Sequence, residues 1–249
     1  MVNRLQGRRI LVSGAAGGIG RACVAAFLAE NASVAMLDRD RKRLDRAASE
    51  LSGHGKITVV DLDITNEAAV VEAVRHAARD LDGLDGVVNS AGIDRVEPFE
   101  ETDWAVWDRI MAVNLTGAMR VCRAALEPMK ASGKGAIVNI ASAAGLRPLN
   151  DRVAYCASKA GLIMATKVLA LDLAKHGIRA NAVCPGATDT ELFRQYLGDA
   201  TIEDVKTHYA LNRIGTTSEI AATIVFLLSD EAGFITGSAL AVDGGRVFH

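Results

Sequence analysis

Short apolar runs alternate along the whole chain with longer segments that carry apolar residues at helical spacing. The short runs are apolar on both sides of a strand's pleat, which is typical of parallel strands buried between helices. They occupy residues 9–13, 33–38, 56–61, 86–89, 136–140, 179–183 and 239–242. Helices are expected at residues 19–30, 67–81, 104–129, 155–176 and 218–228. The pattern predicts an α/β chain with a single-domain Rossmann-type doubly wound fold, in which a seven-stranded parallel sheet has helices on both faces.

The alternation continues from the first strand to the last without a Pro/Gly/Ser-rich linker, a charge block or an internal repeat. We therefore expect residues 1–249 to form one domain. Residues 188–212 have helical character but lie between the sixth and seventh predicted strands, and they are long for a connection. We expect this segment to be an insertion that covers the substrate.

Composition narrows the classes of partner. Half of the residues are hydrophobic and 23% are charged, and the net charge of −2 provides no positive field for nucleic acid. The apolar runs are much shorter than the roughly 20 residues of a membrane span. The N-terminal residues are too short for a signal peptide, so a cytoplasmic location is expected. The four cysteines are scattered and none is spaced with His as metal ligands are, so no metal site is expected.

A glycine-rich turn, Ser13-Gly14-Ala15-Ala16-Gly17-Gly18-Ile19-Gly20, follows the first predicted strand and opens a helix. A phosphate group needs this arrangement, because the backbone must approach it closely and the helix must present free N–H groups. A plain turn also uses glycines, so the turn alone leaves a purely structural role open.

Asp38 ends the second predicted strand, about 20 residues beyond the glycines, where a carboxylate can bind both ribose hydroxyls of an adenosine. A 2′-phosphate carries about −1.5 to −2 charge and would be repelled by that carboxylate. The residue therefore predicts NAD as the cofactor. Arg39 and Arg41 leave NADP open, because either guanidinium would bind the phosphate if Asp38 turned away.

Tyr155 and Lys159 lie four positions apart in a predicted helix, so both side chains can reach one cleft. A free phenol with a pKa near 10 is a poor base at neutral pH, and a nearby ammonium group stabilises its phenolate. Taken alone, the two residues could also be an exposed amphipathic pair.

Together these motifs resemble those of the short-chain dehydrogenase/reductase family, over essentially the whole chain and in the same order. The turn at residues 13–20 is similar to the family's Thr-Gly-x-x-x-Gly-x-Gly, with Ser13 in place of Thr. Residues 89–92 are similar to its Asn-Asn-Ala-Gly, with Ser90 at the second position. Residues 185–190, 235–237 and 242–245 resemble later segments of the family.

The resemblance implies a catalytic set of Asn114, Ser142, Tyr155 and Lys159. Tyr155 would exchange the substrate proton, Ser142 would hold the substrate oxygen, Lys159 would lower the Tyr155 pKa and bind the nicotinamide ribose, and Asn114 would distort its helix and order a water. The resemblance also implies a set of cofactor-binding residues. They are Ser13, Gly14, Gly18, Ile19, Gly20, Asp38, Asp63, Ile64, Asn89, Ala91, Gly92, Tyr155, Lys159, Pro185, Gly186, Thr188 and Thr190.

The expected activity is NAD(H)-dependent hydride transfer to or from a small polar secondary alcohol or ketone, such as a sugar, a sugar acid or a short hydroxy acid. Ser142 and Arg152 are the expected substrate-binding residues, and a homotetramer is the expected assembly. An NADPH-dependent 3-oxoacyl-carrier-protein reductase is an alternative within the fold, although Ala15 and Ala16 place no basic residue in the glycine turn. A non-catalytic NAD-binding sensor or scaffold is the alternative from another class.

Overall fold

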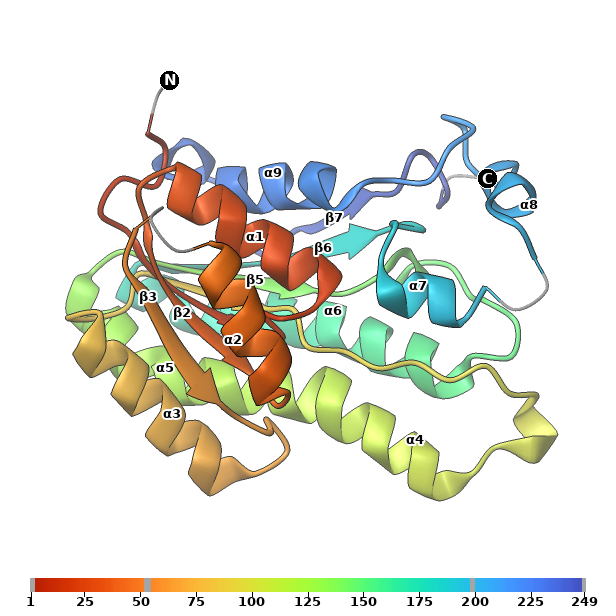
Figure 1. Ribbon diagram of the computed structural model, residues 1–249, viewed down its shortest axis with the longest axis horizontal. Coiled ribbons are helices and arrows are strands. Elements are labelled where there is room, and N and C mark those ends of the chain that lie inside the picture. The colour runs from red at the N-terminus through yellow and green to blue at the C-terminus, as the bar shows by residue number, and fades with distance from the viewer. Residues whose placement is uncertain (1–2, 52–54, 198–199, 248–249) are drawn as a thin grey trace.

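The computed structural model describes residues 3–51, 55–197 and 200–247, and in it a parallel sheet runs through the centre of the molecule (Figure 1). The sheet order is β3-β2-β1-β4-β5-β6-β7, with every neighbouring pair parallel. The strands are β1 (Arg9–Ser13), β2 (Ser33–Asp38), β3 (Ile57–Asp61), β4 (Gly86–Asn89), β5 (Gly135–Ile140), β6 (Ile178–Pro185) and β7 (Ala239–Val242). The predicted doubly wound, seven-stranded parallel sheet is confirmed.

Helices pack on both faces of the sheet and bury its apolar strands (Figure 1). One face is covered by α1 (Gly18–Ala29), α2 (Arg41–Glu50) and α9 (Thr217–Leu228). The other is covered by α3 (Glu67–Asp80), α5 (Ala118–Ser132) and α6 (Val153–Leu173), with α4 (Trp104–Met111) packed against α6. The core therefore has two layers, one on each side of the sheet.

Helix α2 was not predicted from the apolar pattern. Its sequence is mostly charged, and only Leu44 and Ala47 are buried, so it carries almost no apolar stripe. The local signal for its start is the side chain of Asp40, which accepts a hydrogen bond from the backbone N–H of Arg43 at 3.0 Å.

The helix expected at residues 104–129 is divided by a π-helical turn at Ala112–Gly117. Asn114 lies inside this turn, and its side chain is buried. A π turn inside an α-helix frequently marks a functional site. The expected distortion of the helix at Asn114 is therefore present.

The segment Val153–His176, which contains α6, is long and apolar enough to cross a membrane by length and composition alone. Sequence analysis did not anticipate this, because no unbroken apolar run in the segment is long. Its packing provides the physical reason for the composition: α6 lies against β6, and its Ser158 and Lys159 side chains are buried. Such a composition suits a core helix with neighbours on several sides.

The chain reverses its direction across the sheet between β1 and β4, which are neighbours although β2 and β3 separate them in sequence. In open α/β sheets, ligands bind beyond the carboxyl ends of the strands at such a switch point. Two short helices, α7 (Glu191–Gln195) and α8 (Ile202–Lys206), lie in the segment between β6 and β7. The site is therefore expected between the strand ends and this segment.

Candidate active site

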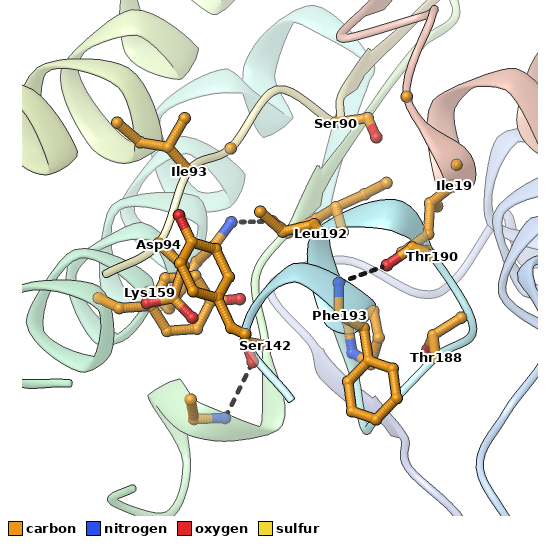
Figure 2. Close-up of a pocket in the computed structure, with 18 of the residues that line it drawn as sticks. Ile19, Ser90, Ile93, Asp94, Ser142, Lys159, Thr188, Thr190, Leu192 and Phe193 are labelled. Atoms are coloured by element: carbon orange, nitrogen blue, oxygen red, sulfur yellow. Dashed lines mark hydrogen bonds between the residues drawn. The ribbon is translucent and has the colours of Figure 1, made fainter. Parts of the chain in front are cut away.

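A cavity of about 770 Å³ lies beyond the carboxyl ends of the strands. Its wall includes the turn between β1 and α1 at one end and Ser142, Tyr155 and Lys159 at the other. Residues of α7 and the segment after it complete the wall, and Figure 2 shows Leu192 and Phe193 of α7 beside Thr190. The predicted insertion therefore borders the cavity that holds the predicted catalytic residues.

The glycine turn is shaped by two close backbone contacts. Gly14 has a φ of +71°, and a Cβ there would lie 2.5 Å from the backbone nitrogen of Ala91. A Cβ on Gly20 would lie 2.1 Å from the carbonyl oxygen of Gly14. A side chain at either position would push the turn away from its neighbours, so glycine is required at both.

Helix α1 presents its first turn to the cavity. No side chain caps it at Gly17, and Gly17, Gly18 and Ile19 line the cavity. Uncapped N–H groups and the positive end of a helix dipole form an anion site. The turn therefore fits the pyrophosphate of a dinucleotide.

Most of the predicted cofactor-binding residues line this cavity, but three of them do not. The side chain of Ser13 is buried and donates to Asn89 Oδ1 at 3.1 Å, while Asn89 Nδ2 donates to Asn139 Oδ1 at 2.8 Å. Gly20 lies behind the turn. Ser13 and Asn89 therefore join the ends of β1 and β4 beneath the cavity, and Asn139, which sequence analysis missed, belongs to the same buried network.

Asp38 lies at the end of β2 and lines the cavity, as predicted. Its Oδ2 accepts from the backbone N–H of Ala16 at 3.1 Å, and its Oδ1 accepts from that of Asp40 at 3.2 Å. These two hydrogen bonds hold the carboxylate beside the glycine turn, where the adenosine ribose of a dinucleotide would lie.

Asp63 and Ile64 also line the cavity. Burial raises the pKa of Asp63, but hydrogen bonds from Thr65 and Arg109 outweigh it and hold that pKa below its usual value. Ile64 is buried and supplies an apolar wall. This combination suits the adenine end of a dinucleotide.

Tyr155 and Lys159 lie in α6, one turn apart, and both line the cavity. Ser142 follows the end of β5 by two residues, and Figure 2 shows it together with Lys159. Lys159 Nζ donates to the carbonyl oxygen of Ile140 at 2.8 Å and lies 5.8 Å from the centroid of the Tyr155 ring. Ser142 Oγ accepts from the backbone N–H of Ala144 at 3.1 Å, which leaves its proton free for another acceptor. The structure therefore brings the predicted phenol, ammonium and hydroxyl groups to one end of the cavity.

Burial raises the pKa of the Tyr155 phenol to about 12, although a hydrogen bond from Ser142 opposes the shift. Burial also lowers the pKa of Lys159 to about 8. The net shift of the Tyr155 pKa is therefore upward, opposite in direction to the expected depression. The reason is desolvation, which disfavours the charged form of both groups.

Asn114 does not line the cavity but lies behind Lys159. Its side chain exchanges two hydrogen bonds of 2.9 Å with the backbone of Ile93 and donates to Ser158 Oγ at 3.1 Å. A Cβ on Gly92 would lie 3.6 Å from Asn114 Oδ1 and 3.5 Å from Lys159 Nζ. Asn114 therefore joins the loop after β4 to α6, and in the structure it is a positioning residue.

Thr190 connects α7 to the glycine turn. Its Oγ1 accepts from the backbone N–H of Phe193 at 3.1 Å and so caps α7 (Figure 2). A Cβ on Gly18 would lie 2.8 Å from Thr190 Cγ2, which shows how closely the two segments pack. Thr188 and the Pro185-Gly186 pair line the same part of the wall. These predicted residues therefore lie together between the turn and Tyr155.

Arg152 lines the cavity, but it is already paired with Asp94. Asp94 is 7% exposed, and its burial raises its pKa even though Arg152 opposes the shift. Arg152 Cζ also lies 6.0 Å from the centroid of the Tyr196 ring. The Arg152 guanidinium, which was expected to bind the substrate, is therefore already paired with the carboxylate of Asp94. No local pattern in the sequence joins these two residues, which lie 58 positions apart.

This ion pair affects the phenol, because Asp94 raises the pKa of Tyr155 and Arg152 lowers it. We expect Asp94→Asn to move the rising limb of the pH profile of alcohol oxidation to lower pH. The negative charge that disfavours phenolate is removed, and Arg152 loses its partner. Arg152→Gln should move the limb to higher pH. The measurement is kcat/KM from pH 6 to 11 for both variants, and shifts in the same direction would contradict this electrostatic account.

The cavity fits a nicotinamide dinucleotide along its length. The glycine turn would hold the pyrophosphate, Asp38 the adenosine ribose, and Lys159 with the 185–190 segment the nicotinamide end. Among the residues that the structure describes, no group of three or more His, Cys, Asp or Glu side chains is placed to hold a metal ion.

Comparisons with known proteins agree with this geometry. A family model described as enoyl-(acyl carrier protein) reductase matches residues 14–246. The chain is 41% identical over 251 residues to 2-(S)-hydroxypropyl-CoM dehydrogenase 3 of Xanthobacter autotrophicus, covering 98% of each protein. It is 37% identical to D-threitol dehydrogenase of Mycolicibacterium smegmatis, covering 97% of this chain and 94% of that protein. The crystal structure of NAD⁺-bound xylitol dehydrogenase is similar with a TM-score of 0.92 at 30% identity, covering 97% of this chain and 100% of that one.

Proposed function

The chain belongs to the short-chain dehydrogenase/reductase family, and on that premise we propose that it interconverts a small polar secondary alcohol and its ketone with NAD(H). That it is an oxidoreductase acting on CH–OH groups follows from the family. The observation that carries the cofactor proposal is the carboxylate of Asp38, held at the adenosine end of the cavity by the backbone N–H groups of Ala16 and Asp40. The similar fold of NAD⁺-bound xylitol dehydrogenase supports the same choice of cofactor.

At the nicotinamide end of the cavity, three side chains share the binding of the substrate oxygen and the transfer of its proton. NAD, when bound, would supply the hydride acceptor and the positive charge of its nicotinamide. Tyr155 Oη takes the proton of the substrate hydroxyl during oxidation, and Ser142 Oγ holds the same oxygen by a hydrogen bond. Lys159 is held against the Ile140 carbonyl, beneath the Tyr155 ring, where its charge favours the phenolate. In reduction, Tyr155 returns the proton to the carbonyl oxygen.

The size and polarity of the cavity support a small polar substrate. The dinucleotide would fill much of the 770 Å³, and the remaining wall at the Tyr155 end includes Arg147, Asn150, Arg152 and His208. Of these side chains, Arg147 is half-buried without an acidic partner among the described residues, and such a group favours a ligand that pairs with it. A long acyl chain or a sterol would offer that guanidinium no anionic partner.

An acyl-carrier-protein reductase is the second candidate, because the description of the matching family model names that carrier. Ala15 and Ala16 place no basic side chain in the glycine turn, and Asp38 opposes a 2′-phosphate. These residues favour the NAD-dependent alcohol dehydrogenase over an NADPH-dependent reductase.

The proposal is tested by measuring NADH and NADPH formation with purified protein on sugars, sugar acids, short hydroxy acids and simple secondary alcohols. The reverse reaction is measured with an acetoacetyl thioester. We expect oxidation of a small polar alcohol with NAD strongly preferred over NADP. Turnover of the thioester alone, with NADPH, would replace the proposal with the second candidate. Tight NAD binding without turnover of any compound would indicate a sensor.

We also propose that the protein works as a homotetramer. Met164, Val168 and Leu171 of α6 are 58%, 48% and 79% exposed, and their spacing places them on one helix face. Trp104 at the start of α4 is 63% exposed. Apolar side chains gathered on packed helices suit a contact with a second copy of the chain. Light scattering after gel filtration tests this, and a monomer at micromolar concentration would contradict it.

A further inference from the structure

Two arginines line the cavity at its substrate end without an acidic partner among the residues that the structure describes. We call Arg147 and Arg246 the distal arginine pair. Both side chains are half-buried, and Arg147 Nη1 donates to the carbonyl oxygen of Arg246 at 3.1 Å. A half-buried guanidinium that lacks a counter-charge attracts an anion strongly, because little water screens it.

Among the residues that the structure describes, the acidic side chains that line the cavity already have partners. Asp94 pairs with Arg152, Asp63 with Arg109 and Glu191 with Arg43, and Asp38 accepts two backbone hydrogen bonds. Asp243, close to Arg246 in sequence, accepts from the backbone N–H groups of Gly245 and Val247. No ion pair joins Asp243 to Arg246 within the described residues. Within the part of the chain that the structure describes, the guanidinium groups of Arg147 and Arg246 therefore have no carboxylate that balances their charge.

The fold brings both arginines to the wall of the cavity that also holds the reacting groups. Arg147 follows the short turn that begins at Ser142, and its backbone N–H donates to the carbonyl oxygen of Ala143 at 2.9 Å. Arg246 follows β7, and its Cζ lies 5.9 Å from the centroid of the Tyr209 ring. The Tyr209 hydroxyl accepts from the backbone N–H of Ala187 at 2.8 Å, which fixes that ring at the 185–190 segment.

We propose that the distal arginine pair binds a carboxylate at the end of the substrate remote from the reacting hydroxyl, so that the preferred substrate is a small hydroxy acid. This inference rests on the proposed dehydrogenase function and narrows it. It also moves the carboxylate site away from Arg152, whose charge Asp94 already balances. The planar guanidinium matches a carboxylate through paired hydrogen bonds, and two such groups would fix the acid's orientation.

The test compares hydroxy acids with their neutral carboxamides of the same length, for chains with the hydroxyl at carbon 3, 4 or 5. The wild-type enzyme should prefer the best acid to its amide by about 10- to 100-fold in kcat/KM. Arg147→Gln and Arg246→Gln should each lower that ratio about tenfold, mainly through KM. Added NaCl should raise the wild-type KM for the acid, and the double variant should lose most of this dependence.

Three controls separate binding of the acid from a structural effect. Arg75→Gln removes an exposed arginine that pairs with Glu72 on α3, and it should leave the ratio unchanged. Arg147→Lys, which keeps the charge, should restore part of the ratio. Melting temperature and NADH affinity report whether the glutamine variants fold.

The outcomes distinguish this inference from the proposed function. Equal use of acids and amides by the wild type, or an unchanged ratio in the folded double variant, would overturn the carboxylate site and leave the dehydrogenase intact. Failure to form NADH from any acid, amide or neutral alcohol would overturn the proposed function itself.

Discussion

Tyr155→Phe is expected to lower kcat for alcohol oxidation about a thousandfold while NADH still binds. The substitution removes only the phenol oxygen, which is the group that exchanges a proton with the substrate, and such a proton transfer contributes roughly 10²- to 10⁴-fold. The ring stays in place beside Lys159, whose Nζ remains anchored by the Ile140 carbonyl. The measurement is steady-state NADH formation, with NADH binding followed by fluorescence.

Tyr196→Phe is the matched control. Tyr196 also lines the cavity and loses the same oxygen, but the structure gives its ring a contact with Arg152 and no place in the proton transfer. We expect that variant to lose at most a few-fold in kcat. A folded Tyr155→Phe enzyme that keeps more than a tenth of wild-type kcat would show that another group is the acid/base.

Asp38→Asn is expected to raise the ratio of NADP to NAD use, expressed as kcat/KM, by about 100-fold. The carboxylate repels a 2′-phosphate and binds the ribose hydroxyls, and the amide has neither the charge nor two acceptor oxygens. Arg39 lines the same part of the cavity and becomes free to attract the phosphate. Most of the change should come from improved KM for NADP, with a smaller loss for NAD.

Asp63→Asn tests whether the change is specific to the ribose position. Asp63 is another carboxylate of the cavity wall, bound by Thr65 and Arg109. Its loss should weaken both cofactors alike and leave their ratio within a few-fold of wild type. An equal change of ratio in the two variants would mean that general charge, and not the position of Asp38, selects the cofactor.

The fold could be predicted from the sequence because the sheet is buried on both faces. Each strand is then a nearly continuous apolar run, and the predicted limits of β1, β2, β4 and β7 match the structure. Helix α2 was not predicted because it lies at the surface and only its Leu44 and Ala47 are buried. The same physical principle explains the prediction and the failure, since periodicity reports burial and α2 buries little.

The residues of the candidate site also fall into those that could be predicted from the sequence and those that could not. Residues set by local geometry, such as Asp38 at a strand end and Tyr155 with Lys159 one turn apart, could be placed from their spacing together with the family resemblance. Pairings between residues of distant segments could not be predicted from the sequence. The partner of Arg152, Asp94, lies after β4, and Arg246 joins Arg147 from the other end of the chain. Only the folded sheet brings these segments together.

The most direct test of the central claim is whether hydride passes from the alcohol to the nicotinamide. The best alcohol from the substrate panel is deuterated at its carbinol carbon and oxidised with NAD by the wild-type enzyme, and the NADH is examined by mass spectrometry. The account predicts one deuterium in each NADH formed. NADH without deuterium, or reduction of NADP but not NAD, would contradict it.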